Sequence, residues 1–333
     1  MKLSKKGAKI ALTYFITIIA SLVIIGGAAF IVLSKVMAED DPGIAAVEVT
    51  TTADSGVYAP TELENRTALF ILDAGNKRTS TCFVLARLLP TETKVVIVPL
   101  QSDTLCSVNG TEDTLYELYR AGGGQYAKRA VEAVCGLRVD KYLKFDKTSF
   151  ELFATLMGTV NYEAPYSLIC EDPDTNEVTV IREGSVALDG VTMRKLFTFP
   201  SFKSGETGRA ATVGSVVVDV LNSAQETRLS TGMDQIVETV LKSSVETDIA
   251  DIDYKTSKKA MQYIVDNSYK GAELVLPSGK YNSDEEYVLD DEFITSLKTW
   301  FGVDMLDYSD SMPQVGSSEP PFGNTEKGSD TAE

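Results

Sequence analysis

The stretch Thr67-Ala-Leu-Phe-Ile-Leu-Asp73, followed by Ala74-Gly75, decides the fold class of this 333-residue chain. A short apolar run that ends at Asp and Gly is typical of a buried strand that opens into a turn. Downstream, Thr81–Leu89 and Lys94–Leu100 flank the turn Pro90–Thr93, which predicts a hairpin. We expect these strands to be neighbours in one central sheet. The residues expected to be buried in it are Leu69, Ile71, Val84, Val96 and Val98.

Helical patterns alternate with further strands along the rest of the chain. Asp146 is a suitable N-cap, while Gly136 and Gly158 are suitable helix stops. The expected helices are about Gln125–Cys135, Thr148–Met157, Gly190–Thr198, Arg209–Leu229, Met233–Ser244, Ser257–Val265 and Glu292–Trp300. Further strands are expected at Lys141–Phe145 and Glu273–Pro277, and a second hairpin turns at 172–176. This interleaved order predicts a mixed α/β (α+β) fold, with a central mixed sheet flanked by helices on both faces.

The N-terminus has the pattern of a membrane anchor. Ile10–Leu33 carries no charge, and at about 1.5 Å per residue such a helix spans roughly 36 Å, enough for the ~30 Å hydrocarbon core. Four lysines precede this run and acids follow it, which by the positive-inside rule places residues 1–9 in the cytoplasm and the body outside. A cleaved signal peptide is the alternative, supported by Val36-Met37-Ala38. Its apolar region is usually about 7–15 residues, so we expect a retained single-pass helix.

Composition divides the remainder into three parts. Residues 34–61 are expected to be a linker, 62–302 an extracytoplasmic domain, and 303–333 a disordered acidic tail rich in Ser, Pro and Gly. The net charge of the whole chain is -17, which argues against a nucleic-acid partner. Histidine is absent, which excludes Ser-His-Asp and Cys-His nucleophiles and His-ligated zinc. The four cysteines show no metal-like spacing, and buried thiols are at least as plausible as disulfides.

The run Gly122-Gly123-Gly124 is the one phosphate-binding candidate of glycine-rich type that the sequence offers. Ahead of a helix, its backbone N–H groups would be able to cradle a phosphate. The alternative is a flexible turn between two helices, and an isolated glycine run favours that interpretation.

The order of elements from about Thr67 to Gly302 resembles the LytR-CpsA-Psr (LCP) family of bacterial cell-envelope proteins. Arg78-Thr79-Ser80-Thr81 stands where the family has Arg-Ser-Asp-Thr, and Val98–Thr104 is similar to its Ile-Pro-Arg-Asp-Thr segment. Leu188-Asp189-Gly190 and Met157–Val160 resemble two further family turns, and Glu206-x-x-Arg209 resembles the start of its Asp-x-x-Arg-x-x-Arg-Gln phrase. The short cytoplasmic tail and single anchor are also typical of the family.

The resemblance implies a function. Family members transfer glycopolymers from a polyprenyl-pyrophosphate carrier to peptidoglycan with the help of Mg²⁺. An apolar channel is then expected between the sheet and the helices Thr148–Met157 and Arg209–Leu229. The implied ligand-binding residues are Arg78, Thr81, Asp103, Thr104, Glu206 and Arg209. Of these, Arg78, Asp103 and Arg209 are the candidates for catalysis, and Asp103 is the candidate for a metal ligand.

The chain departs from the family pattern where the chemistry takes place. The metal-binding Asp of Arg-Ser-Asp-Thr becomes Ser80, and the arginine after Ile-Pro becomes Leu100 or Ser102, depending on the alignment. Phe197–Ser201 stands where the family has two arginines, and Thr212-Val213 replaces the second half of the last phrase. Each charge-assisted hydrogen bond contributes about 1.5–3 kcal/mol, so three missing arginines predict a rate loss of several decades.

Three hypotheses follow from the sequence. The first is a degenerate LCP-like protein of the cell envelope that binds polyprenyl-(pyro)phosphate-linked glycopolymer, or an envelope partner, with little or no catalysis and no cofactor. The second is an active Mg²⁺-dependent phosphotransferase that attaches glycopolymers to peptidoglycan. The third is a sensor or interaction ectodomain that binds no lipid.

Overall fold

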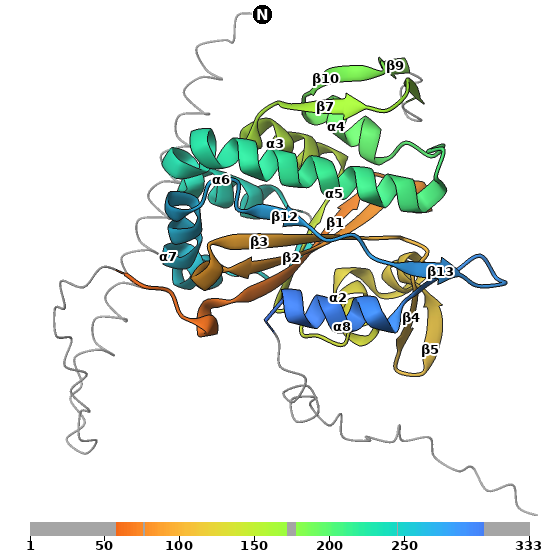
Figure 1. The fold of residues 1–333 in the computed structure, drawn as a ribbon, viewed down its shortest axis with the longest axis horizontal. Coiled ribbons are helices and arrows are strands. Elements are labelled where there is room, and N and C mark those ends of the chain that lie inside the picture. Colours follow the sequence, from red (N-terminus) through yellow and green to blue (C-terminus); the bar gives the residue numbers. More distant parts are fainter. Residues whose placement is uncertain (1–57, 76, 172–177, 245, 303–333) are drawn as a thin grey trace, which may run out of the picture. The chain divides into compact units, whose positions relative to one another are not determined.

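The centre of the fold is a six-stranded mixed sheet. A computed structural model describes residues 58–302, apart from 76, 172–177 and 245. The strand order is β11-β6-β1-β2-β3-β12 (Figure 1), with β1–β2–β3 antiparallel and the pairs β1/β6 and β3/β12 parallel. The strand bounds are Arg66–Asp73 (β1), Thr81–Leu89 (β2), Lys94–Leu100 (β3), Lys141–Phe145 (β6), Glu246–Thr247 (β11) and Ala272–Leu274 (β12).

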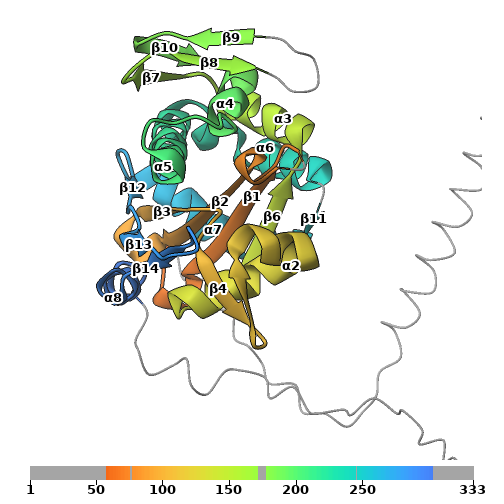
Figure 2. The ribbon, with the colours of Figure 1, turned by 90° about the vertical axis from the view of Figure 1, so that its right-hand side faces the viewer.

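Helices cover both faces of this sheet, as expected (Figure 2). On one face, α2 (Leu115–Cys135) and α8 (Asp291–Trp300) pack against a buried cluster that includes Leu69, Ile71 and Val98. On the other face the cover is α3 (Lys147–Met157), α4 (Gly190–Phe197), α5 (Gly205–Ala224) and α6 (Ser230–Ser243). All five residues predicted to be buried are buried, in three adjacent strands. The prediction of one central mixed sheet is therefore confirmed.

Local signals set several helix ends where the sequence predicts them. The Asp146 carboxylate accepts a hydrogen bond of 2.8 Å from the Ser149 backbone N–H, and the Ser149 hydroxyl accepts one of 2.9 Å from the Asp146 N–H. This reciprocal pair satisfies two N–H groups that the first turn of α3 would otherwise leave free. The helix ends at Gly158, whose φ of 102° suits glycine better than any residue with a side chain.

The region after Ser204 differs from the prediction. Helix α5 begins at Gly205, four residues earlier than expected, and runs through a single wide turn, Gln225–Leu229, directly into α6. No proline interrupts this path, so the weak helix formers around Gly232 do not end it. The Gln225 side chain also donates to backbone carbonyls at the end of α7 (Asp251–Asn267), which holds the wide turn in place. The expected strand Glu273–Pro277 is shorter and lies at β12.

Four two-stranded antiparallel sheets lie outside the central sheet in the described residues, and the sequence predicts only one of them. They are β4 (Leu105–Val108) with β5 (Thr111–Thr114), β7 (Val160–Ala164) with β10 (Gly184–Leu188), β8 (Leu168–Glu171) with β9 (Val178–Ile181), and β13 (Gly279–Tyr281) with β14 (Tyr287–Leu289). The β8–β9 pair is the predicted second hairpin, and its turn, predicted at 172–176, lies outside the described residues.

Both edges of the central sheet are bonded to side chains. At the β12 edge, the Asn222 amide accepts from the Ala272 N–H at 2.9 Å and donates to the Ala272 carbonyl at 3.1 Å. At the other edge, the Asp248 carboxylate, just beyond β11, accepts from the Tyr142 N–H of β6 at 2.7 Å. Polar side chains therefore take places that an additional strand would use.

The expectations for residues 1–9, 10–33, 303–333 and most of the 34–61 linker fall outside the described residues. Between residues 58 and 302, the described part of the chain has no helix that is both long and apolar enough to cross a membrane. Of the two alternatives for the cysteines, the structure has buried free thiols, at Cys82, Cys106, Cys135 and Cys170.

Candidate functional site

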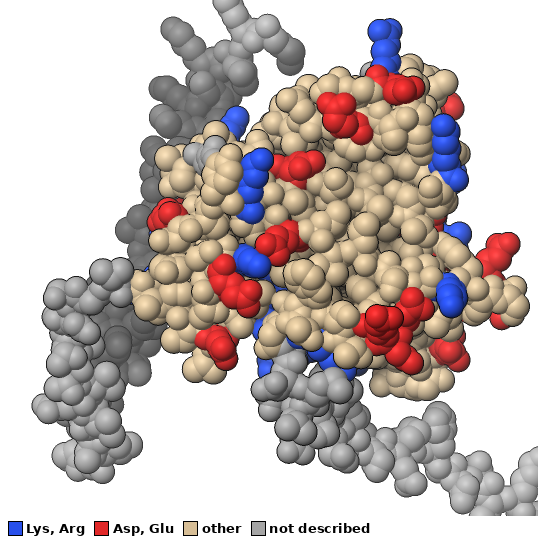
Figure 3. All heavy atoms as spheres, viewed as in Figure 1, with Lys and Arg blue, Asp and Glu red and all other residues tan. Residues whose placement is uncertain are grey.

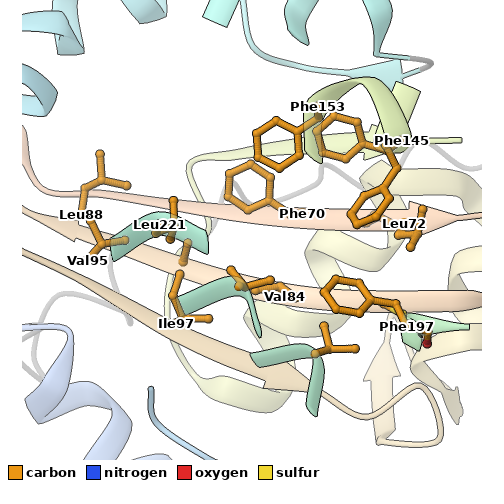
Figure 4. A pocket seen from close by; sticks show the side chains of 16 residues that line it. Phe70, Leu72, Val84, Leu88, Val95, Ile97, Phe145, Phe153, Phe197 and Leu221 are labelled. Atoms are coloured by element: carbon orange, nitrogen blue, oxygen red, sulfur yellow. Dashed lines mark hydrogen bonds between the residues drawn. The ribbon is translucent and has the colours of Figure 1, made fainter. Parts of the chain in front are cut away.

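An apolar cavity of about 150 Å³ lies between the central sheet and helices α3, α4 and α5 (Figure 4). This is the place where the sequence predicts an apolar channel. Five phenylalanines line it, of which Phe70, Phe145, Phe153 and Phe197 are labelled in Figure 4. The full lining is Phe70, Ile71, Leu72, Cys82, Val84, Ala86, Leu88, Val95, Ile97, Phe145, Phe150, Phe153, Phe197, Val213, Val217 and Leu221.

The periodicity of the sequence builds these walls. Alternate residues of a strand share a face, so Val84, Ala86 and Leu88 of β2 line the cavity together. On α5, Val213, Val217 and Leu221 recur at intervals of four, which places them on one face of the helix. A volume near 150 Å³ with apolar walls is known to stay dry and to admit a benzene-sized molecule.

A glycine sets the distance of α5 from the sheet. A Cβ atom at Gly214 would lie 2.6 Å from Cγ of Pro99 in β3 and 2.7 Å from Cδ1 of Leu274 in β12. Both distances are too short for carbon atoms in contact, so a side chain at this position would push the helix away. Gly214 therefore keeps the helical wall of the cavity close to the strands.

A buried ion pair of Arg209 and Glu206, both on α5, lies beside the apolar cavity. Cys82 and Val213 line both the apolar cavity and a small void of about 10 Å³ next to this pair. The Arg209 Nε donates to Glu206 Oε2 at 2.8 Å, and its Nη2 donates to Glu206 Oε1. Only 4 % of the Arg209 side chain is exposed, so the guanidinium is enclosed by protein.

Every nitrogen of the Arg209 guanidinium has a partner inside the protein. Besides Glu206, the acceptors are the carbonyls of Thr79 (3.3 Å), Thr81 (2.9 Å) and Phe197 (3.2 Å), the Ser102 hydroxyl (3.1 Å) and the Cys82 sulfur (3.0 Å). A guanidinium has five N–H donors, and seven contacts account for them all. Arg209 thus ties α5 to β2, to the segment after β3 and to the end of α4. Phosphate would have to displace some of these bonds to be bound by it.

The charges of this pair are stable at neutral pH. Burial by itself raises the pKa of Glu206, but the Arg209 guanidinium and hydrogen bonds from the Ser102 N–H and hydroxyl outweigh burial and hold the pKa below its usual value. Burial acts to lower the pKa of Arg209, whereas Cys82 and Glu206 raise it further, with a net increase. Removal of one partner would leave the other charge buried and unpaired, which typically costs about 3–5 kcal/mol.

Asp103 is buried near the pair with one oxygen unbonded. Its Oδ1 and the neighbouring Thr104 hydroxyl have no hydrogen-bond partner, while the Tyr281 hydroxyl of β13 lies 3.3 Å from Asp103 Oδ2. Burial, and then the Glu206 charge, raise the pKa of Asp103 to about 6, against a lowering by Arg78 and Tyr281. Buried polar atoms without a partner are rare in native proteins, so Oδ1 is an acceptor that the described residues leave available to a ligand donor.

The predicted ligand residues thus lie in one region but differ in their availability. Arg78, in the short turn before β2, is exposed, and its charge acts on Asp103. Thr81 is buried and contributes its carbonyl to Arg209, and Glu206 is bonded through both oxygens. Sequence reasoning missed Ser102, Cys82 and Tyr281, because their contacts join segments that are distant in the chain.

The residues present do not fit a resident Mg²⁺ site. Among the described residues there is no group of three or more acidic or Cys side chains able to hold a metal ion. Mg²⁺ needs near-octahedral oxygen ligands, usually from one or two carboxylates and a substrate phosphate. Asp103 offers one unbonded oxygen, and Ser80 supplies no carboxylate where the family has its metal-binding Asp.

The glycine run does bind an anion, but the anion belongs to the protein. Gly122 and Gly123 have non-helical backbone angles and join two helical parts of α2, so the turn between helices is the correct interpretation. The Gly124 N–H donates to Glu246 Oε1 at 3.0 Å, and the Tyr142 hydroxyl donates to the same oxygen at 3.0 Å. The alternative, a phosphate cradle, is wrong, because the Glu246 carboxylate already accepts the hydrogen bond from the N–H group that a phosphate would use.

One face of the molecule carries mixed charge. On the face shown in Figure 3, acidic and basic side chains are interspersed and large areas are uncharged. The absence of a nucleic-acid partner stays a prediction from composition.

Comparison with known proteins accords with this geometry. Residues 64–298 match the LytR-CpsA-Psr family. The chain belongs to this family. The family is involved in attaching glycopolymers to the cell wall. Comparison with curated protein sequences finds no match.

Solved structures share the fold at low sequence identity. A putative transcription regulator from Eubacterium siraeum is 20% identical with a TM-score of 0.66, over 78% of this chain and 99% of its own. TagV of B. subtilis is 18% identical with a TM-score of 0.56, over 72% and 98%. TagT, in a structure described as bound to LI-WTA, is 14% identical with a TM-score of 0.55, over 74% and 93%. At these identities the similarity shows the fold alone.

Proposed function

We propose that this chain is a membrane-anchored, extracytoplasmic LCP protein that binds the apolar chain of a polyprenyl-linked envelope glycopolymer and transfers nothing. One observation carries the proposal. The apolar cavity is bordered by an arginine whose nitrogens are all bonded within the protein. The cavity supplies affinity for hydrocarbon, while the Arg209 guanidinium is engaged within the protein and Ser80 supplies no carboxylate where the family has its metal-binding Asp.

Energetics favour binding by the apolar walls. Each buried CH₂ contributes about 0.8 kcal/mol, so one five-carbon isoprene unit contributes roughly 4 kcal/mol, which by itself corresponds to a Kd near 1 mM. A cavity of about 150 Å³ accommodates such a fragment of the chain rather than its whole length. The short-chain alcohol geraniol is therefore a suitable first ligand.

Transfer and binding are separable in one experiment. The full-length chain is incubated with an undecaprenyl-diphosphate-linked sugar, peptidoglycan and Mg²⁺, and both retention of the lipid and labelling of peptidoglycan are measured. We expect retention that is insensitive to Mg²⁺ and no labelling above a protein-free control. Robust Mg²⁺-dependent labelling that Arg209→Ala abolishes would overturn the proposal.

An active phosphotransferase is the second candidate, and a specific observation favours it. Asp103 keeps an unbonded, buried oxygen near the charge of Arg78, which is a pair of groups able to contact a metal-bound diphosphate. In that case Asp103→Asn and Arg78→Ala each abolish labelling. An ectodomain that binds no lipid is the outcome if neither retention nor labelling is found.

The membrane topology is tested independently. A reporter enzyme fused after Glu333 is expected to be active only in the extracytoplasmic compartment. Activity of the same fusion in the cytoplasm would contradict the topology and the envelope role with it.

A further inference from the structure

The Glu206 carboxylate is bound in the way that a phosphate would be bound. Its two oxygens face the Nε and Nη2 edge of Arg209, and Oε1 also accepts from the Ser102 N–H at 3.1 Å and the Ser102 hydroxyl at 2.8 Å. The paired edge of a guanidinium recognises carboxylate and phosphate with the same geometry. Arg209 and Ser102 therefore form an anion site, and the chain itself supplies the anion.

This anion site lies against the apolar cavity. Cys82 and Val213 belong to the walls of both the cavity and the small void beside Arg209. That void measures about 10 Å³, which is at most the space of one water molecule, so a phosphate has no room while Glu206 is in place. The negative charge of Glu206 is also maintained at neutral pH, because Arg209 and Ser102 hold its pKa low against the effect of burial.

We infer that Glu206 is the specificity-determining residue of the cavity, an internal anion that keeps Arg209 from the phosphate of a ligand. The inference rests on the proposed function, in which an apolar chain enters the cavity. The wild-type protein then recognises the hydrocarbon and ignores the phosphate. Removal of the Glu206 carboxylate turns the same arginine into a phosphate-binding group at the border of the cavity.

The test compares geraniol with geranyl diphosphate, which share one hydrocarbon chain and differ in the head group. Binding to the full-length chain is measured by displacement of a fluorescent apolar probe. For the wild type we expect the two Kd values to agree within about threefold. For Glu206→Ala we expect a preference of roughly tenfold or more for the diphosphate, since one charge-assisted contact is worth at least that factor. A wild-type preference for the diphosphate of tenfold, or no change in Glu206→Ala, overturns the inference.

A second measurement does not depend on the lipid. Inorganic diphosphate is added to Glu206→Ala, and its melting temperature is followed. We expect a saturable increase that the wild type does not show, because the added anion replaces the missing carboxylate. If the wild type binds neither geraniol nor geranyl diphosphate, the proposed function fails, and the inference about Glu206 is then decided by this increase, whose absence overturns it.

Two further variants make the result interpretable. Glu206→Gln keeps the shape of the side chain and removes its charge, so it serves if Glu206→Ala does not fold, and we expect a head-group preference in the same direction. Glu151→Ala is the matched control, because Glu151 accepts from the buried Arg194 at 2.6 Å and lines neither cavity. Glu151→Ala is expected to leave the ratio of the two Kd values unchanged, and a shift equal to that of Glu206→Ala contradicts the inference.

Discussion

Filling the apolar cavity should separate ligand binding from folding stability. Val217 lies on the cavity face of α5, between Val213 and Leu221. Val217→Phe places four additional carbons in the cavity and excludes a similar volume of ligand. At about 0.8 kcal/mol per buried carbon, the loss of binding free energy is about 3 kcal/mol, or roughly 100-fold in Kd for geraniol.

The same substitution should not destabilise the protein. A cavity of about 150 Å³ costs up to about 3.6 kcal/mol at about 24 cal/mol per Å³, and filling part of it recovers part of that cost. We expect a gain of about 1 kcal/mol, which corresponds to an increase in Tm of about 2–4 °C for a domain of this size. The two effects have opposite signs, so unfolding of the variant cannot imitate the loss of binding.

The assay pairs probe displacement by geraniol with thermal unfolding of the same preparations. Val191→Phe is the matched control, because it makes the same chemical change at an exposed position on α4. It should alter neither quantity. If Val217→Phe binds geraniol as tightly as the wild type does, the cavity is not the ligand site and the reasoning is refuted.

Three other predictions concern the polar region and the thiols. Arg209→Ala should lower the free energy of unfolding, measured in urea, by about 3–5 kcal/mol, because Glu206 is left buried and unpaired. Arg78 is exposed, so Arg78→Ala should change this free energy by less than about 0.5 kcal/mol. Equal effects of the two substitutions would contradict the account. Since the pKa of Asp103 is raised to about 6, its contribution to stability is full below about pH 4 and is lost as pH rises through 6. Wild type should therefore lose stability relative to Asp103→Asn between pH 4.5 and 7, and parallel pH profiles would refute this. Ellman's reagent should find no reactive thiol in the native protein and four after unfolding, because burial raises the pKa of each; rapid reaction of the native protein would be the contrary result. These thiols are Cys82, Cys106, Cys135 and Cys170.

The central sheet could be predicted because its signals are local. The apolar pattern of β1 to β3 and the N-cap Asp146 depend on neighbouring residues, and these strands and the start of α3 lie where expected. The course of Gln225–Leu229 could not be predicted, since contacts with α7 hold it. Small hairpins such as β13–β14 carry too few residues to produce a periodic pattern.

For the candidate site, the sequence predicts which residues lie near one another but not which hydrogen bonds they make. Family resemblance brought Arg209, Glu206 and Asp103 together, and the structure places them in one region. The bonding state of Arg209 was beyond the sequence, because its partners Ser102 and Cys82 are more than a hundred residues away. The identity of a side chain indicates what it is able to bind, but only its neighbours decide whether its donors are available.

The amide of Asn222 at the β12 edge has a consequence for association between copies of this chain. An unpaired edge strand is a template on which another chain is able to add a strand and begin aggregation. Because Asn222 bonds both the N–H and the carbonyl of Ala272, that residue offers no free pair to an incoming chain. The Asn222 side chain thus disfavours the addition of a strand from another chain at the β12 edge. Asn222→Ala would expose the Ala272 N–H and carbonyl to such pairing, and Asn222 does not line the cavity.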